Sequence, residues 1–121
     1  MKYFEQDRKY NFVDANNVFL GYDSDQNCCE LASWYFSFRP GVIPVSDSDN
    51  INADELDAYS FDTNYFREES GDPEATAIAE FKLVAAGLPD IYLILHNTHN
   101  GYYGHGFKCE ISGEVLRSGI L

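Results

Sequence analysis

The sequence has few basic residues, few cysteines and no long hydrophobic run. Eight Lys and Arg stand against 20 Asp and Glu among 121 residues, which gives a formal net charge of −12. Nucleic-acid affinity is built from clustered Lys and Arg, so this balance argues against direct nucleic-acid binding and favours a basic protein surface as partner. No stretch approaches the roughly 20 apolar residues of a membrane span, and the first residues lack the apolar run of a signal peptide. We therefore expect a cytoplasmic protein that does not bind membranes.

The three cysteines do not suggest a disulfide framework. Cys28 and Cys29 are adjacent, and a bridge between neighbouring residues closes only a strained ring. The chain must then be held together by a hydrophobic core, and 45% hydrophobic and 16% aromatic residues are enough to build one. Length and composition predict a single domain over residues 1–121.

Strand patterns dominate the chain. Residues 10–13 and 18–22 have the composition of strands, and the Asx-rich segment 14–17 between them favours a turn. Alternation over 77–84 predicts a strand with one wetter face, and the short apolar run 91–95 predicts the central strand of a sheet.

The C-terminal part predicts a hairpin and a last strand. The Asn100-Gly101 pair is typical of tight hairpin turns, which would return the chain from the central strand to a strand over 107–111. Alternate residues of that return strand are apolar and should face inward. Gly113 then introduces a last strand over 115–120.

Helix is expected in two places. Hydrophobic residues recur at helical spacing between Cys28 and Phe38, Asn27 with Glu30 resembles a capping box, and Pro40 would end the helix. A second capping pattern at 52–55 predicts a single helical turn. The fold class expected is α+β, an antiparallel sheet of about five or six strands with one short helix packed on a face.

The acidic residues are concentrated in one segment. Residues 46–80 contain eleven carboxylates and a single base, Arg67, and we expect about 46–75 to form an edge or an excursion. Such a run is usually a solvated face. The alternative is mimicry, in which the charge density of DNA is copied to compete for the basic groove of another protein. The candidate binding residues of this segment are Asp54, Glu55, Asp57, Asp62, Glu68 and Glu69.

A glycine- and aromatic-rich stretch over 101–106 offers a second candidate binding surface. Tyr102 and Tyr103 could stack on a flat ligand while the flanking glycines allow close approach. The alternative is a hairpin turn that packs on its own sheet.

The cysteines and histidines form a candidate metal site. Cys28, Cys29, His96 and His99 supply the sulfur and nitrogen ligands that zinc prefers, although no Cys-x-x-Cys spacing is present. The alternative is a small buried thiol and histidines that bond the turn. Cys28 with a histidine base would also suit nucleophilic catalysis, but no flanking motif supports it, and no catalytic residue is assigned.

At two motifs the chain resembles an uncharacterised domain family of bacteria and their phages. Members pair a Cys-Cys-Glu motif with a downstream His-Asn-x-His-Asn-Gly-Tyr-Tyr-Gly-Gly run, matched here by Cys28-Cys29-Glu30 and by residues 96–104. His105 stands where the family has its second glycine. The family has no established activity. The resemblance implies that the two motifs meet in space, as a structural nucleus or a common site, and that the chain comes from a phage or mobile element.

Two functions of different classes follow. The first is a small acidic binding protein of a phage or mobile element, acting as an inhibitor or nucleic-acid mimic on a basic site of a host defence-type protein. The second is a metal- or small-ligand-binding domain built from Cys28, Cys29, Glu30, His96 and His99, with zinc as the cofactor and catalysis left open. A homo-oligomer is compatible with either.

Overall fold

The computed structural model of the 121-residue chain describes residues 1–25, 31–40, 51, 53–70, 76–98 and 104–121. Over these ranges the chain forms ten strands in two antiparallel sheets, and helix is limited to one short 3-10 turn, η2 (Ala53–Leu56). Within the same ranges no helix is long and apolar enough to span a membrane. The single helical turn expected near residues 52–55 is confirmed by η2.

Sheet A combines the two ends of the chain. It contains β1 (Lys2–Gln6), β2 (Lys9–Val13), β3 (Val18–Asp23), β9 (Gly106–Ile111) and β10 (Glu114–Ile120), in the order β1-β2-β3-β9-β10. The predicted hairpin of 10–13 with 18–22 is confirmed by β2 and β3, which pair with Phe12 opposite Leu20. The predicted last strand is β10, which pairs with β9.

Sheet B is built from the middle of the chain. It contains β4 (Leu31–Ser37), β5 (Ser60–Phe61), β6 (Arg67–Ser70), β7 (Thr76–Val84) and β8 (Ile91–Thr98). The order is β4-β8-β7-β5, and β6 also pairs with β7. The predicted central strand is confirmed, because β8 lies between β4 and β7. Both β5 and β6 pair with β7. Ser60 of β5 lies opposite Val84 at the C-terminal end of β7, and Arg67 of β6 lies opposite Glu80, nearer its N-terminal end.

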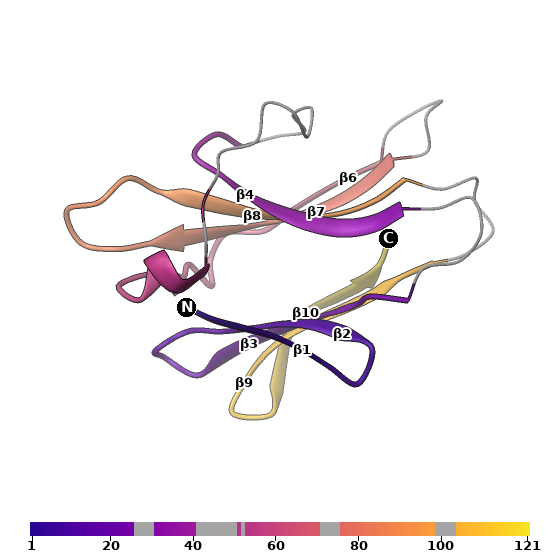
Figure 1. The fold of residues 1–121 in the computed structure, drawn as a ribbon, viewed down its shortest axis with the longest axis horizontal. Coiled ribbons are helices and arrows are strands. Elements are labelled where there is room, and N and C mark those ends of the chain that lie inside the picture. The colour runs from indigo at the N-terminus through magenta and orange to yellow at the C-terminus, as the bar shows by residue number, and fades with distance from the viewer. Residues whose placement is uncertain (26–30, 41–50, 52, 71–75, 99–103) are drawn as a thin grey trace.

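The two sheets form two layers around one core (Figure 1). Large side chains that are fully buried come from both sheets: Phe12, Leu20 and Tyr22 from sheet A, and Leu83, Leu93 and Leu95 from sheet B. Alternate residues of the central strands, such as Val18, Leu20 and Tyr22 of β3, enter this core, and each fully buried large apolar side chain contributes about 1.5–3 kcal/mol. The core is therefore what fixes the register of both sheets.

The two ends of the chain link the layers at opposite ends of the molecule (Figure 1). The amino group of Met1 donates a hydrogen bond to the carbonyl of Leu56 in η2 at 2.7 Å. The last residue, Leu121, exchanges two backbone hydrogen bonds with His105, and its carbonyl accepts one from the side chain of Asn97 in β8 at 3.0 Å. Polar contacts thus reinforce the apolar core at both ends.

The helix predicted between Cys28 and Phe38 is wrong, because residues 31–37 form strand β4. Ala32, Trp34 and Phe36 lie opposite Asn97, Leu95 and Leu93 of β8 and face the core with them. The helical prediction rested on Leu31, Trp34 or Tyr35, and Phe38, whereas the core-facing residues are Ala32, Trp34 and Phe36, which recur with the period of a strand. Aromatic residues also favour strands. The fold is therefore mostly β, and not the α+β fold that the sequence predicted.

The sequence also predicted a single sheet with a hairpin at Asn100-Gly101 between the central strand and strand 107–111, and both predictions are wrong. Among the described strands, β8 pairs with β4 and β7 of sheet B, whereas β9 pairs with β3 and β10 of sheet A. The two strands therefore belong to different layers, and residues 99–103 between them lie outside the described part. The alternation over 107–111 is confirmed, since Phe107 and Cys109 are buried, but alternation does not reveal which sheet a strand joins.

Candidate functional site

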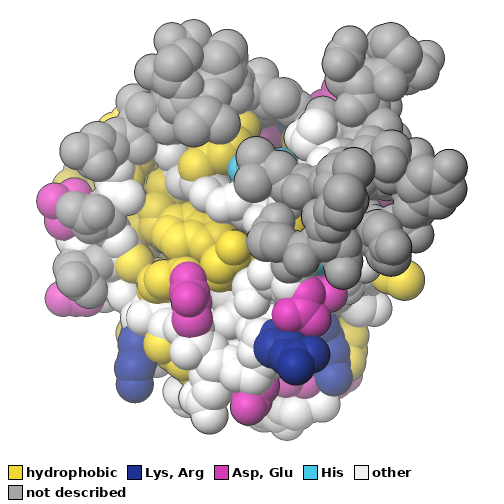
Figure 2. Space-filling model, turned by 45° about the vertical axis from the view of Figure 1, so that its right-hand side comes forward, with side chains coloured by type: hydrophobic (Ala, Val, Ile, Leu, Met, Phe, Trp, Pro, Cys, Tyr) yellow, Lys and Arg dark blue, Asp and Glu magenta, His cyan; other side chains and the backbone are white. Residues whose placement is uncertain are grey.

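Charge is divided unequally between the two layers. The segments that build sheet A, residues 1–25 and 104–121, contain five basic and seven acidic residues, a net charge of −2. Residues 26–103, which include every strand of sheet B, contain three basic and thirteen acidic residues, a net charge of −10. In the view of Figure 2 the Lys and Arg side chains lie in the lower half, on the side of sheet A in Figure 1. Five of these thirteen acidic residues (Glu30, Asp47, Asp49, Asp72 and Glu74) lie outside the described part. The described residues of sheet B and its connections hold the other eight against three basic residues, so this layer is more acidic than sheet A.

The acidic residues predicted to bind a partner fall into two groups on this layer. Glu55 in η2 and Asp57 just after it are exposed, and the carboxylate of Asp57 lies 3.7 Å from the amino group of Met1. Glu68 and Glu69 are exposed on β6 but point to opposite faces of the strand: Glu69 accepts a hydrogen bond from Arg67, and the Glu68 carboxylate lies near Gly119 of β10. The half-buried Asp62 lies between β5 and β6, where its carboxylate accepts the N–H of Asn64. The side chain of Asp54 lies outside the described part.

These groups do not merge into one cluster. η2 precedes β5, which pairs with the C-terminal end of β7, whereas β6 pairs with the N-terminal half of β7. The two pairs of carboxylates are therefore separated along the layer, and a partner would have to extend over its length to contact both.

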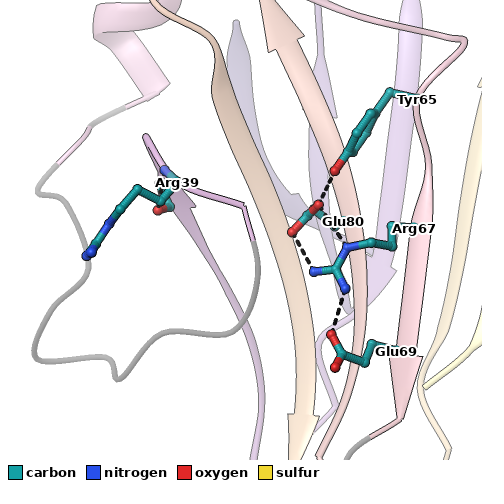
Figure 3. Close-up of polar contacts among 6 residues, drawn as sticks. Arg39, Tyr65, Arg67, Glu69 and Glu80 are labelled. Atoms are coloured by element: carbon teal, nitrogen blue, oxygen red, sulfur yellow. Dashed lines mark hydrogen bonds and ion pairs between the residues drawn. The ribbon is translucent and has the colours of Figure 1, made fainter.

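A buried carboxylate lies under the β6 group (Figure 3). Glu80 of β7 is fully buried and accepts hydrogen bonds from Arg67 Nε at 3.2 Å, from Arg67 Nη2 at 3.0 Å and from the hydroxyl of Tyr65. Arg67 Nη1 also donates to Glu69 at 2.6 Å. Arg39 is drawn apart from this network. Arg67 thus binds two carboxylates at once. The net charge of Arg67, Glu68, Glu69 and Glu80 together remains negative.

The network shifts the pKa of its donors. Burial, followed by the hydrogen bond to Glu80, raises the pKa of Tyr65 to about 12. Hydrogen bonds to Glu80 and Glu69 raise the pKa of the Arg67 guanidinium above its ordinary value. Both groups therefore remain protonated at neutral pH, and both donate hydrogen bonds to the buried carboxylate of Glu80.

Of the predicted metal ligands, only His96 lies in the described part. It is buried on β8, on the side of the sheet opposite to Leu95 and Asn97, and its ring centroid is 5.8 Å from that of Tyr35. Burial lowers the pKa of His96, which favours the neutral imidazole that binds metals.

The β4–β8 register bears on the two motifs. Leu31 pairs with Thr98 at the end of the two strands. The Cys28-Cys29-Glu30 motif directly precedes Leu31 in the sequence, and His99 directly follows Thr98. These motif residues lie outside the described part, as do Tyr102 and Tyr103. Among the described residues no group of three or more His, Cys, Asp or Glu is arranged to hold a metal, so the zinc site stays a prediction.

Two buried polar pairs were not expected from the sequence. One is Glu80 with Arg67, for which the single base of the acidic segment was the available signal. The other is His105, which is fully buried with Nδ1 3.6 Å from the carboxylate of Asp23 and 3.2 Å from its carbonyl oxygen. These residues are 82 positions apart, so no local pattern could pair them.

Comparison of the chain with protein-family models, with curated proteins and with solved structures finds no match.

Proposed function

We propose that this chain is a small acidic binding protein of a phage or mobile element, and that it inhibits a host defence-type protein by occupying a basic site. The observation that carries this proposal is the division of charge, with −10 of the total −12 in the segment that builds sheet B. A nucleic acid is the usual occupant of such a basic site, and the acidic layer would replace it. The role requires no catalytic residue.

The physical basis is long-range attraction followed by contact. Charges on a surface act over about 10 Å at 0.1 M salt, so a segment with net charge −10 steers a basic groove toward it. Exposed carboxylates at the rim of an interface mainly set the association rate and its salt dependence. Glu55 and Asp57 at one end of the layer, and Glu68 and Glu69 at the other, are the residues expected to make the contacts.

Charge reversal tests the proposal. The immobilised full-length protein would capture host proteins at low salt, and the partner sought is one that duplex DNA displaces. For this purified partner we expect the Glu68→Lys/Glu69→Lys variant, the Glu55→Lys/Asp57→Lys variant, or both, to weaken binding by about tenfold or more, with a steep loss as salt rises.

A matched control separates the acidic layer from total charge. The Asp25→Lys/Glu114→Lys variant changes the net charge by the same amount, but both residues belong to the segments that build sheet A. We expect it to retain most of the affinity. Equal losses in the control and test variants, or binding that is indifferent to salt, would contradict the proposal.

A second candidate function is a metal- or small-ligand-binding domain built from Cys28, Cys29, Glu30, His96 and His99. The pairing of Leu31 with Thr98 favours it, because the two motifs continue the chain from the same end of sheet B. Neutral His96 is available as a nitrogen ligand.

Elemental mass spectrometry of protein purified without chelator tests this second function. Near-stoichiometric zinc that is lost in Cys28→Ser and His99→Ala variants is the expected result. Cys109→Ser is the control, since this third cysteine is buried in the core on β9 and should not affect the metal. Protein without metal, even after zinc is added, would leave the motifs as a structural nucleus.

A further inference from the structure

An open groove of about 340 Å³ lies on the outer face of sheet A, away from the acidic layer. It is lined by Lys9, Gly21, Asp23, Gly106, Phe107 and Lys108. Its volume is within the usual range for small-molecule sites, which run from about 300 to 1,000 Å³.

The glycine at position 106 leaves the floor of the groove open. Gly21 of β3 lies opposite Lys108 of β9, and Tyr22 lies opposite Phe107, which places Asp23 beside Gly106. Gly21 and Gly106 are therefore diagonal neighbours on one face of two central strands. A Cβ added at Gly21 would lie 3.2 Å from the Phe19 ring and 3.7 Å from Lys9 Cδ, so side chains flank Gly21 and the open floor is at Gly106. A Cβ added at Gly106 would have the carbonyl oxygen of Gly119 as its nearest neighbour, at 3.8 Å. The strand would accept a side chain at position 106, so the lack of one in glycine leaves free space on the sheet.

Both signs of charge face this space. Lys9 and Lys108 flank β3 from either side, two strand spacings and two residues apart, so their Cα atoms are separated by about 12 Å. An anionic group over β3 is within reach of both ammonium groups. Asp23 supplies a carboxylate on β3 itself, and the N–H of Asp25 at 3.0 Å and His105 Nδ1 at 3.6 Å hold that carboxylate in place.

We propose that this groove binds a free α-amino acid. Its carboxylate lies between Lys9 and Lys108, its ammonium group contacts Asp23, and its side chain lies over the bare backbone of Gly106. Two cationic groups and one anionic group in a small open groove match a zwitterion better than a simple anion, which Asp23 would repel. The site is independent of the acidic layer and of both functions proposed above.

Matched ligands test the proposal on the full-length protein. The probes are L-alanine and L-phenylalanine, with 3-phenylpropionate and 2-phenylethylamine as analogues that lack the ammonium and the carboxylate. In ¹H–¹⁵N spectra we expect an amino acid to shift the amide signals of Gly21 and Gly106. Both analogues should bind more weakly, by about threefold or more, because each loses one set of ion pairs. The proposal is overturned if neither amino acid shifts these signals, or if the analogues bind as well as L-phenylalanine.

Variants at the groove give an independent readout. Gly106→Val should fill the groove and abolish the shifts at Gly21, while the melting temperature stays the same or rises, because valine favours a strand. Gly106→Ala is the milder form. Lys9→Met/Lys108→Met should also abolish binding. Ser118→Val and Lys2→Met make the same kinds of change outside the groove lining and should leave binding intact. Binding that survives in folded Gly106→Val would contradict the site.

Discussion

The side chain of Asp14 accepts a hydrogen bond of 2.8 Å from the backbone N–H of Phe61, 47 residues further along the chain. Its other carboxylate oxygen accepts the N–H groups of Asn16 and Val18, both at 2.9 Å, within the turn between β2 and β3. One buried carboxylate therefore shapes a turn of sheet A and also attaches that turn to β5 of sheet B. This link joins the two layers at a point where apolar packing alone would leave backbone donors without partners.

Replacement of Asp14 by alanine tests this link. Asp14→Ala leaves the N–H groups of Phe61 and Val18 buried without their acceptor, and we expect the free energy of unfolding to fall by about 3 kcal/mol. Urea denaturation gives this value. Asn16→Ala in the same turn is the control, and because Asn16 is exposed it should cost no more than about 0.5 kcal/mol. Similar losses for the two variants would mean that the link between layers contributes little.

The Glu80–Arg67 pair gives a second prediction. Glu80 is fully buried, so Arg67→Met removes the cation that pairs with it and should destabilise the protein by about 2–3 kcal/mol. The value is below that of a fully buried pair because the Arg67 side chain is partly exposed. The double variant Arg67→Met/Glu80→Leu should be more stable than Arg67→Met alone, since it leaves no buried charge.

Glu69→Gln is the control for this pair. It removes the exposed ion pair of Arg67 and keeps the buried one, so a loss below about 1 kcal/mol is expected. If the double variant were less stable than Arg67→Met, the buried carboxylate would be favourable by itself, and the argument from desolvation would fail.

Much of the strand content could be predicted from the sequence, because it depends on local alternation. The hairpin of β2 and β3, the central strand β8 and the last strand β10 all followed from short patterns. β4 did not, since its residues satisfy both a helical and a strand period, and pairing with β8, some 60 residues away in sequence, decides between them. The division into two sheets is likewise set by contacts distant in sequence, which local periodicity does not contain.

The candidate sites were predictable to different degrees. The concentration of acid could be read directly, and it lies in the segment that forms sheet B. The separation of Glu55 from Glu68 along that layer depends on which half of β7 each neighbouring strand joins, so the sequence could not supply it. The groove on sheet A was missed because two isolated glycines, 85 positions apart in the numbering, become neighbours only through the β3–β9 register.

The pKa of Tyr65 gives a third prediction. Because it is raised from 10.0 to about 12 in the folded protein, the unfolded chain loses this proton first as pH rises. Stability should therefore be complete below about pH 10 and should fall between about pH 10 and 12. Tyr65→Phe should reduce that slope, as measured by urea denaturation at a series of pH values. Tyr3, whose pKa burial also raises, should contribute a separate share that Tyr3→Phe removes. An unchanged slope in both variants would show that other groups govern alkaline unfolding.

The thiol of Cys109 gives the last prediction. It is free and buried in β9, and burial raises its pKa to about 11, so the thiolate fraction at pH 8 is on the order of 0.1%. In a Cys28→Ser/Cys29→Ser variant Cys109 is the single cysteine. We expect Ellman's reagent to label this variant very slowly when folded and to label one thiol rapidly in denaturant. Rapid labelling of the folded variant would mean that the β9 side of the core opens often, and that the packing between the two layers is looser than its buried aromatic residues indicate.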